Sequence, residues 1–334
     1  MPEGLIRGLA GLDDHDFQGG SIVTIGAFDG LHRGHQALLE QIIAASEKSS
    51  LSTVAVTFEP LPREYFAPDQ APARLMSFRE KFEGLRQLGI DYVLLLRFDA
   101  NIQSMSAEAF VEQLFVRGLN ARHVVVGDDF RFGNQGRGDF ALLSQMMSEV
   151  GAKVTPTPSV LVDGQRVSSS LIRQVLDAGD FPAAQRLLGR PYAIVGKVFY
   201  GRQLGRQLGF PTANVQLRRR CTAMAGVYCV EVALDPPSLA VELASHDSEQ
   251  SGSEEQGITQ WLPAVANVGT RPTVSRSKTV SLEVHLLDFA NNIYGQRIAV
   301  RFCKKIREEQ RFDGLDALQD QIAKDKSEAI AYFS

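Results

Sequence analysis

Cysteine is scarce in this chain. Among its 334 residues there are 3 cysteines, Cys221, Cys229 and Cys303. Their spacing matches neither a metal site nor a redox motif, and an odd number does not make a disulfide framework. The sequence therefore predicts a protein of a reducing compartment, namely the cytoplasm.

Long apolar runs and a large excess of one charge are absent as well. No uninterrupted hydrophobic stretch approaches the roughly 20 residues that span a membrane, and residues 1–20 carry acids rather than the apolar core of a signal peptide. The formal net charge is −4, and hydrophobic residues make up 44% of the chain. We therefore expect a globular protein without a membrane or nucleic-acid partner, since a nucleic-acid-binding surface is broadly basic. Weak self-association is left open.

The usual signatures of phosphate and metal binding are missing too. No Gly-Lys-Ser/Thr triplet marks a Walker A loop, and no His-Glu-x-x-His pattern marks a zinc site. In their place stands Gly26–His35, which reads Gly-Ala-Phe-Asp-Gly-Leu-His-Arg-Gly-His. It follows a β-type run, Ser21–Ile25, and precedes apolar residues at helical spacing over 36–48. The sequence thus predicts a strand, a glycine-rich turn and a helix.

This turn has the features of a site for a nucleotide phosphate. Its glycines let the backbone approach a ligand, and the N–H groups at the helix start favour an anion. His32 and His35 lie three residues apart, so both imidazoles reach one bound group. Such a pair is otherwise a surface feature or half of a metal site, but the strand-turn-helix context favours phosphate chemistry. We predict catalytic roles for both histidines and nucleotide contacts for four neighbours in the turn, Gly26, Phe28, Asp29 and Gly30.

The first half of the chain alternates strand and helix patterns, which predicts an α/β domain with a parallel sheet. The strand patterns lie at 21–25, 53–58, 92–96, 123–126 and 153–157, and the helix patterns at 36–48, 78–88, 106–117 and 140–150. Ligands of such sheets bind beyond the carboxyl ends of the strands. We expect four segments to meet at that edge, namely Gly26–His35, Phe58–Arg63, Gly127–Gly133 and Val167–Arg173.

The last three segments supply further candidates. Three hydroxyls open a helix between two arginines, a group that suits a polyphosphate, although serine clusters also serve merely as helix caps. These residues are Arg166, Ser168, Ser169, Ser170 and Arg173, and Arg173 would balance the charge of a departing pyrophosphate. The other two segments add two candidates. Asp129 could contact a nucleotide or be a plain turn residue. The prolyl loop with Phe58, Pro60 and Pro62 could hold a flat ring or simply end a strand.

After residue 188 the pattern changes to short strands. They lie at 192–199, 226–234, 262–268, 279–287 and 298–305, and a helix pattern follows at 315–332. Many short strands with one helix predict a β-barrel. We place the domains at 1–185 and 186–334. Residues 235–260, which hold six acids and no Lys or Arg, are interpreted as a mobile loop between two barrel strands.

A glycine-rich stretch of the second half suits ATP and a metal ion. Gly201 and Gly205 could form a flap over phosphates, and Thr212 and Asn214 alternate onto one side of an extended segment. A hydroxyl and an amide oxygen so placed suit a magnesium ion between ATP phosphates. A glycine-rich hairpin with a turn asparagine is the alternative.

A second stretch, Ser281–Leu287, alternates polar and apolar residues. Glu283 and His285 share one face of the predicted strand. In the barrel lumen, Glu283 would be a general base for a substrate hydroxyl. A solvated outer face is the alternative, and we keep it for His285.

The motifs of both halves resemble known families. The histidine turn resembles the His-x-Gly-His signature of the nucleotidyltransferase superfamily, and Ser168–Arg173 resembles the Ser-Ser-Thr/Ser-x-x-Arg signature of flavin-type adenylyltransferases. Three further segments, Phe210–Asn214, Asn267–Thr273 and Glu283–His285, resemble riboflavin kinase. Over almost its whole length the chain therefore resembles the bacterial bifunctional riboflavin kinase/FMN adenylyltransferase (FAD synthetase) family.

This resemblance implies a Rossmann-like nucleotidyltransferase domain followed by a six-stranded antiparallel β-barrel with a terminal helix. The barrel would transfer the ATP γ-phosphate to riboflavin, with Glu283 as base and Mg²⁺ held at Thr212 and Asn214. The N-terminal domain would join FMN to ATP and release pyrophosphate and FAD. Implied flavin contacts are Phe58, Pro60, Pro62, Arg311 and Phe312. Many family members carry His or Gln where this chain has Leu61, so a polar contact is lost there.

Two other functions stay open. The chain could be a monofunctional nucleotidyltransferase whose barrel only binds flavin, although Thr212, Asn214 and Glu283 together argue against this. It could also be a non-catalytic protein that senses flavin or contacts RNA, because His-x-Gly-His also occurs in tRNA-charging enzymes. The net negative charge of the chain argues against binding to RNA.

Overall fold

The computed structural model describes residues 2–15, 17–200, 212–217, 221–236, 260–272, 278–289 and 291–334. Contacts divide the chain into two compact units. Unit 1 comprises Met1–Pro72 and Ser77–Ser168, and unit 2 comprises Ala73–Met76 and Ser169–Ser334. The helices that follow Ser168 therefore pack with the barrel, and the functional boundary at residue 185 stays a prediction.

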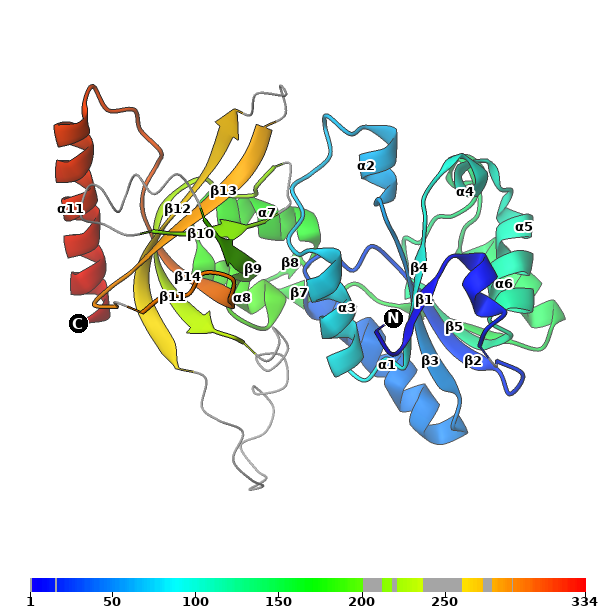
Figure 1. Cartoon of the computed structure of the whole chain (residues 1–334). Coiled ribbons are helices and arrows are strands. Elements are labelled where there is room, and N and C mark those ends of the chain that lie inside the picture. Colours follow the sequence, from blue (N-terminus) through cyan, green and yellow to red (C-terminus); the bar gives the residue numbers. More distant parts are fainter. Residues whose placement is uncertain are drawn as a thin grey trace, which may run out of the picture. The chain divides into compact units, whose positions relative to one another are not determined.

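Unit 1 is built on a parallel sheet with helices packed against it (Figure 1). Its strands are β1 (Leu5–Arg7), β2 (Ser21–Ile25), β3 (Ser52–Phe58), β4 (Tyr92–Leu96), β5 (Ala121–Gly127) and β6 (Lys153–Thr157). They lie in the order β1-β4-β3-β2-β5-β6. From β2 the chain winds one way through β3 and β4, and then the other way through β5 and β6. An open parallel sheet binds ligands at such a reversal, beyond the carboxyl ends of its strands, so the fold directs attention to the ends of β2 and β5.

The helices of unit 1 largely follow the predicted periodicity. They are α1 (Arg33–Ser49), α2 (Pro62–Phe66), α3 (Phe78–Gln87), α4 (Ala100–Ser104), α5 (Ala107–Phe110) and α6 (Phe140–Glu149). Shorter elements are η1 (Leu9–Leu12), the π-helical η2 (Val111–Gly118), η3 (Asn134–Gly136), and the strands β7 (Leu161–Val162) and β8 (Gln165–Arg166), which pair as a hairpin. The helix predicted at 106–117 thus becomes π-helical after α5.

The central strands of unit 1 are buried because helices cover the sheet. All five residues of β2 are buried, and so are Val54, Ala55 and Val56 in β3. Buried parallel strands read as continuous β-branched runs rather than as alternating patterns. Of the two polar residues of β2, Ser21 donates through Oγ to the carbonyl oxygen of Leu119 at 2.6 Å. The buried Oγ1 of Thr24 has no hydrogen-bond partner in the described residues.

Unit 2 is a closed antiparallel barrel of six strands, as predicted. The strands are β9 (Ala193–Phe199), β10 (Ala213–Gln216), β11 (Gly226–Leu234), β12 (Trp261–Pro272), β13 (Lys278–Leu286) and β14 (Arg297–Arg307). Their order is β10-β13-β12-β11-β14-β9, and β9 pairs with β10 to close the barrel. The helices are α7 (Ser169–Asp177), α8 (Phe181–Leu188) and the terminal α11 (Leu315–Phe333).

The terminal helix α11 lies on the outside of the barrel (Figure 1). Its buried Ala329 packs against Cys229 and Leu287, with Val265 beside them. The buried carboxylate of Asp325 accepts from Nε and Nη2 of Arg307, at 2.9 and 2.7 Å. This bidentate ion pair fixes the helix to β14.

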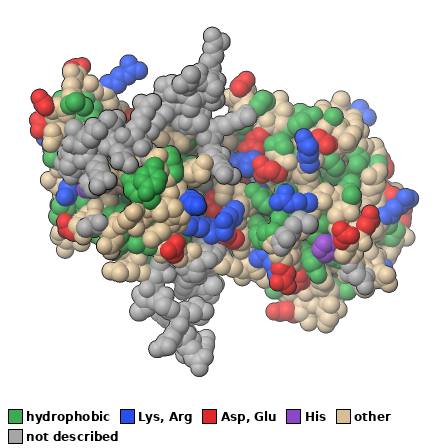
Figure 2. All heavy atoms as spheres, viewed as in Figure 1, with side chains coloured by type: hydrophobic (Ala, Val, Ile, Leu, Met, Phe, Trp, Pro, Cys, Tyr) green, Lys and Arg blue, Asp and Glu red, His purple; other side chains and the backbone are tan. Residues whose placement is uncertain are grey.

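No helix in the described residues is both long enough and apolar enough to cross a membrane. On the face seen in Figure 2, acidic and basic side chains both occur, among hydrophobic and other side chains.

Candidate active sites

The histidine turn, Gly26–His35, leaves the carboxyl end of β2 and enters α1. Within it, Phe28 and Leu31 adopt positive φ angles of 47° and 43°, next to Gly30 at 93°. Such a backbone strains non-glycine residues. It is held here because the side chains of Phe28 and Leu31 are fully buried. Strain of this kind concentrates at functional sites.

His32 is fixed by its role as the N-cap of α1. Its Nδ1 accepts a hydrogen bond from the backbone N–H of His35 at 3.3 Å. Because Nδ1 is the acceptor, the neutral ring carries its proton on Nε2. The residue is 6% exposed. His32 therefore has a set orientation, and its neutral ring holds the proton on Nε2.

His35 stacks on His32, with ring centroids 3.7 Å apart and planes inclined by 14°. Phe28 meets His35 edge-on at 5.3 Å. In the described structure, Nδ1 of His35 is buried and has no hydrogen-bond partner. Burial, the His32 ring and the Lys81 cation hold the pKa of His35 well below 6.5. At neutral pH this ring is uncharged, so the stacked pair avoids like-charge repulsion.

The segment before α7 comes close to the histidine turn. A Cβ built on Gly34 would lie 3.2 Å from the His32 ring and 3.8 Å from the carbonyl oxygen of Val167. Ser168, the next residue, belongs to the same unit. The close approach of Val167 supports the expected meeting of these segments at the sheet edge.

The remaining members of the serine segment belong to unit 2. Ser169 and Ser170 form the first turn of α7, and Arg173 follows one turn later. Nε of Arg173 donates to the carbonyl oxygen of Ala73 at 2.5 Å. The placement of these three residues beside the histidines stays a prediction.

The loop after β5 brings two predicted residues together. Nη2 of Arg166, in the small hairpin, lies 2.7 Å from Oδ2 of Asp129 and 3.5 Å from Oδ1 of Asp128. Asp128 also accepts from Oγ of Ser159 at 3.1 Å. All three charged side chains are exposed, and such ion pairs contribute only about 0–1 kcal/mol. A nucleotide could therefore exchange for either partner at low energetic cost.

The segment after β3 is only partly the prolyl loop that was expected. The Glu59–Pro60 peptide is cis, and Pro62 begins the short helix α2. Leu61 is the N-cap of α2, and its N–H donates to the Glu64 carboxylate at 2.9 Å. A proline without an N–H suits the first helical position, which is why this loop becomes a helix.

An aromatic cluster at the same edge was not predicted as a unit. Phe98, after β4, meets Phe58, Tyr65 and Phe66 edge-on at centroid distances of 5.6, 5.3 and 5.6 Å. Phe66 is 60% exposed. The members of this aromatic cluster come from β3, from α2 and from the segment after β4, so only the fold reveals that they form one surface.

A buried cation near the turn was also missed. Lys81 of α3 is 3% exposed, and its Nζ donates to Oγ1 of Thr57 at 3.3 Å. In the sequence, Lys81 belongs to a charged stretch of an amphipathic helix, a pattern typical of a solvated face.

In the barrel, three polar residues form a row across neighbouring strands. Asn214 of β10 stands opposite Glu283 of β13, and Glu283 stands opposite Asn267 of β12. Directly opposed residues on one face of a sheet have Cβ atoms about 4.5–5.5 Å apart. Asn214 is 5% exposed, whereas Glu283 and Asn267 are partly exposed. The row places a carboxylate between two amides.

The structure corrects the expected lumen position of Glu283. The alternate residues Leu282 and Val284 are buried, and they face the buried Val268 and Ala266 of β12. Val265, which shares the strand face of Asn267, packs against the cluster beneath the outer helix α11. Glu283 therefore lies on the outer face, because apolar side chains fill the interior.

The other predicted barrel residues are only partly described. Thr212 directly precedes β10, whereas Gly201, Gly205 and nearly all of the acidic stretch at 235–260 lie outside the described residues. Arg311 and Phe312 lie between β14 and α11. The Phe312 ring sits 5.7 Å from the Arg307 guanidinium.

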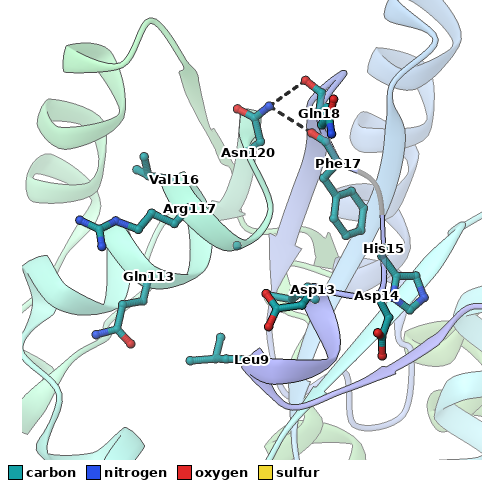
Figure 3. A pocket seen from close by; sticks show the side chains of 12 residues that line it. Leu9, Asp13, Asp14, His15, Phe17, Gln18, Gln113, Val116, Arg117 and Asn120 are labelled. Atoms are coloured by element: carbon teal, nitrogen blue, oxygen red, sulfur yellow. Dashed lines mark hydrogen bonds between the residues drawn. The ribbon is translucent and has the colours of Figure 1, made fainter.

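A hollow of about 840 Å³ lies at the opposite edge of the parallel sheet (Figure 3). Its lining comes from segments that precede β2 and β5, including His15, Phe17 and Asn120. Nδ2 of Asn120 donates to the carbonyl oxygens of Phe17 and Gln18, both at 3.0 Å. No predicted site residue lines this hollow, so it is not the predicted phosphate site.

Family models match both halves. A model described as FAD synthetase matches residues 14–171. A model described as riboflavin kinase matches residues 188–333.

Curated relatives match nearly the whole chain. A bifunctional riboflavin kinase/FMN adenylyltransferase of Escherichia coli (strain K12) is 45% identical over 329 residues, covering 98% of this chain and 97% of that protein. Proteins of the same name from Pseudomonas fluorescens and Haemophilus influenzae are 44% and 40% identical; they cover 98% and 99% of this chain, and 97% and 99% of their own lengths.

A solved structure from Streptococcus pneumoniae, titled as a macrolide-efflux protein, is also similar. It has a TM-score of 0.73 and 27% sequence identity, and the match covers 97% of this chain and 98% of that one. The likeness extends over both the sheet and the barrel.

Proposed function

The chain belongs to the bifunctional riboflavin kinase/FMN adenylyltransferase family, and we propose which of its residues carry out each of the two reactions. The C-terminal half phosphorylates riboflavin to FMN with ATP, and the N-terminal half adenylylates FMN to FAD with ATP and releases pyrophosphate. The matches to both family models leave no support for a monofunctional or a non-catalytic protein.

We assign FMN adenylylation to the histidine turn. A phosphate oxygen of FMN bonds to the α-phosphorus of ATP, and the bond from that phosphorus to the departing pyrophosphate breaks. His32 donates through Nε2–H, and the first N–H groups of α1 point at the same anion. Positioning and electrostatics suffice, without a covalent enzyme intermediate. Ser168, Ser169, Ser170 and Arg173 are proposed to hold the pyrophosphate.

Two neighbouring features would position the substrates of this reaction. Asp129 and Arg166, which pair at the end of β5, are proposed to contact the nucleotide. The exposed edge of Phe66, with Phe58 and Phe98 behind it, offers a surface on which the flavin ring can stack.

We assign riboflavin phosphorylation to the outer face of the barrel. Glu283 accepts the proton of the riboflavin 5′-hydroxyl as that oxygen bonds to the γ-phosphorus and ADP leaves. Asn214 and Asn267 flank Glu283 in the strand register. Each can donate an amide N–H, which holds the carboxylate in place.

The donor set on this face fits a magnesium ion. Asn214 and Thr212 offer an amide oxygen and a hydroxyl, which are hard ligands. Among the described residues, no group of three or more His, Cys, Asp or Glu could hold a metal ion. Substrate phosphates and water would supply further ligands. The bound ion would neutralise charge on the ATP phosphates.

The proposal rests on one observation: the capped histidine pair and Glu283 lie in different compact units. Chromatography of the products from riboflavin, ATP and Mg²⁺ tests it, with wild type, His32→Asn and Glu283→Gln compared. His32→Asn should accumulate FMN without FAD, and Glu283→Gln should convert only supplied FMN. If both folded variants lost both activities, the assignment would be wrong. A cytoplasmic location and the lack of a nucleic-acid partner stay predictions from composition.

A further inference from the structure

The buried Lys81 has no part in the reaction as assigned above. Lys81 is 3% exposed, and a lysine buried to this degree is held by polar partners. Its Nζ donates to Oγ1 of Thr57 at 3.3 Å, and that hydroxyl donates to the carbonyl oxygen of Ala27 at 3.5 Å. Ala27 is the second residue of the histidine turn. A chain of polar contacts thus joins α3, the end of β3 and the turn.

The backbone at Lys81 is held in place by a helix cap. Oγ of Ser77 accepts from the N–H of Glu80 at 3.2 Å, and the Glu80 carboxylate accepts from the N–H of Ser77 at 2.5 Å. Such a reciprocal capping box satisfies two helix-start donors and orders the first turn. Lys81 follows Glu80 directly, so the ordered backbone fixes the position of its Cα.

The charge of Lys81 acts on the catalytic pair. Burial lowers the pKa of His35 most, and the His32 ring of the same turn and the positive charge of Lys81, from α3, lower it further. Two stacked imidazoles cannot both be protonated at low cost. A lysine ammonium can supply lasting positive charge where phosphates gather, because an ammonium is ordinarily protonated at neutral pH.

We propose that Lys81 is a positioning residue of the adenylyl-transfer site. Its ammonium anchors the histidine turn through Thr57 and provides fixed positive charge next to His32 and His35 as pyrophosphate leaves. This inference rests on the assignment of FMN adenylylation to the histidine turn.

The test compares Lys81→Met, Lys81→Arg and Thr57→Val with wild type in the full chain. Met has a similar length but no charge. Because removing one partner of a buried charged contact can destabilise a protein, thermal unfolding of every variant is measured alongside its activity. Lys153→Met is the matched control, because Lys153 likewise lowers the pKa of a histidine, His123, but lies at the start of β6, away from the site. Four readouts are needed: kcat and KM for FMN adenylylation from pH 5.5 to 8.5, riboflavin kinase activity, thermal unfolding, and the pKa of the His35 imidazole by NMR.

Lys81→Met should lower kcat for FMN adenylylation by about tenfold to a hundredfold, as is typical when a partner that orients a metal ligand is removed. Riboflavin kinase activity should stay at the wild-type level. The pKa of His35 should rise, and the acidic limb of the pH profile should move to higher pH. Lys81→Arg should retain the wild-type position of that limb, and Thr57→Val should show a smaller loss of kcat.

Two outcomes would overturn the proposal. One is a wild-type kcat and an unshifted pKa of His35 in Lys81→Met. The other is an equal loss of both enzyme activities with a lowered unfolding temperature in both Lys81→Met and Thr57→Val, which would show a purely structural role. The activity of His32→Asn separates failure of the Lys81 proposal from failure of the assignment of the turn. An inactive His32→Asn together with a fully active Lys81→Met refutes only the role of Lys81. A fully active His32→Asn refutes the assignment of FMN adenylylation to the histidine turn.

Discussion

The histidine turn of unit 1 and the Asn-Glu-Asn row of unit 2 are both proposed to act on ATP, but they offer opposite chemical means. The turn gathers donors, namely imidazole N–H, helix-start N–H groups and the nearby Lys81. The row instead centres on an acceptor, the Glu283 carboxylate. The reactions explain the difference. FMN arrives with an ionised phosphate and needs no base, whereas the riboflavin hydroxyl must lose a proton.

The two sites also differ in how the fold supports them. The turn depends on strained backbone at Phe28 and Leu31, held by buried side chains. The row depends on regular strand register, in which alternation alone puts Asn214, Glu283 and Asn267 on one face. A substitution that alters the backbone should therefore harm the turn more than the row.

The strongest test of the contrast is Glu283→Gln. The change keeps the shape of the side chain and removes the base, so riboflavin kinase activity should fall by about 10²–10⁴-fold. Adenylylation of supplied FMN should remain at the wild-type rate. Steady-state assays of each reaction measure this, and a parallel loss of both rates would contradict the separation of the sites.

His32→Asn should give the reverse pattern. Asparagine is a good N-cap, so α1 keeps its cap while the imidazole is lost. FMN adenylylation should fall by about 10²–10³-fold, as for loss of one transition-state donor. Circular dichroism should match wild type. A variant with full adenylylation would show that the histidine does not contact the reacting phosphates.

Gly34→Ala probes the backbone dependence of the turn. The added methyl would lie 3.2 Å from the His32 ring, a contact tight enough to displace it by a few tenths of an ångström. A small misplacement of a catalytic group is costly, and we expect about a tenfold loss of kcat for FMN adenylylation. The control is Gly19→Ala, whose added methyl would meet nothing within 4 Å, and it should leave the rate unchanged. Gly295→Ala would not serve, because its φ of 83° strains an alanine.

The smallest predicted effect is on the pH dependence of the free energy of unfolding. The pKa of His35 is well below 6.5 in the folded protein, so the unfolded chain takes up this proton first as pH falls. His35 thus contributes stability that is complete above pH 6.5 and is lost progressively below it, by at most about 1.4 kcal/mol per pH unit. His35→Asn should reduce the slope of unfolding free energy between pH 6.5 and 5.5 in urea titrations. An unchanged slope would contradict the neutral state of the ring.

Much of the fold could be predicted because its strands are short and strongly patterned. Strands β2, β4 and β6 have the predicted bounds. The strand β1 was missed because its three residues are too few to show a pattern, and it is added at the sheet edge by pairing with β4. The strand β10 has only four residues and follows the glycine-rich stretch, so it was interpreted only as an extended segment.

The sites were predictable where local sequence sets the geometry. His32 and His35 stack because three-residue spacing at a helix start brings their rings together. The lumen position of Glu283 was wrong because alternation alone does not say which face of a strand points inward. Lys81 and the Phe98 cluster depend on contacts across elements, which a single sequence does not show.

The most direct test of two independent sites is complementation between two variants. His32→Asn and Glu283→Gln are each incubated with riboflavin, ATP and Mg²⁺, then mixed, and FMN and FAD are resolved by chromatography; supplied FMN is given separately to Glu283→Gln. We predict no FAD from either variant alone with riboflavin, FAD from the mixture, and FAD from Glu283→Gln with supplied FMN. A folded Glu283→Gln protein that fails to adenylylate supplied FMN would contradict the account.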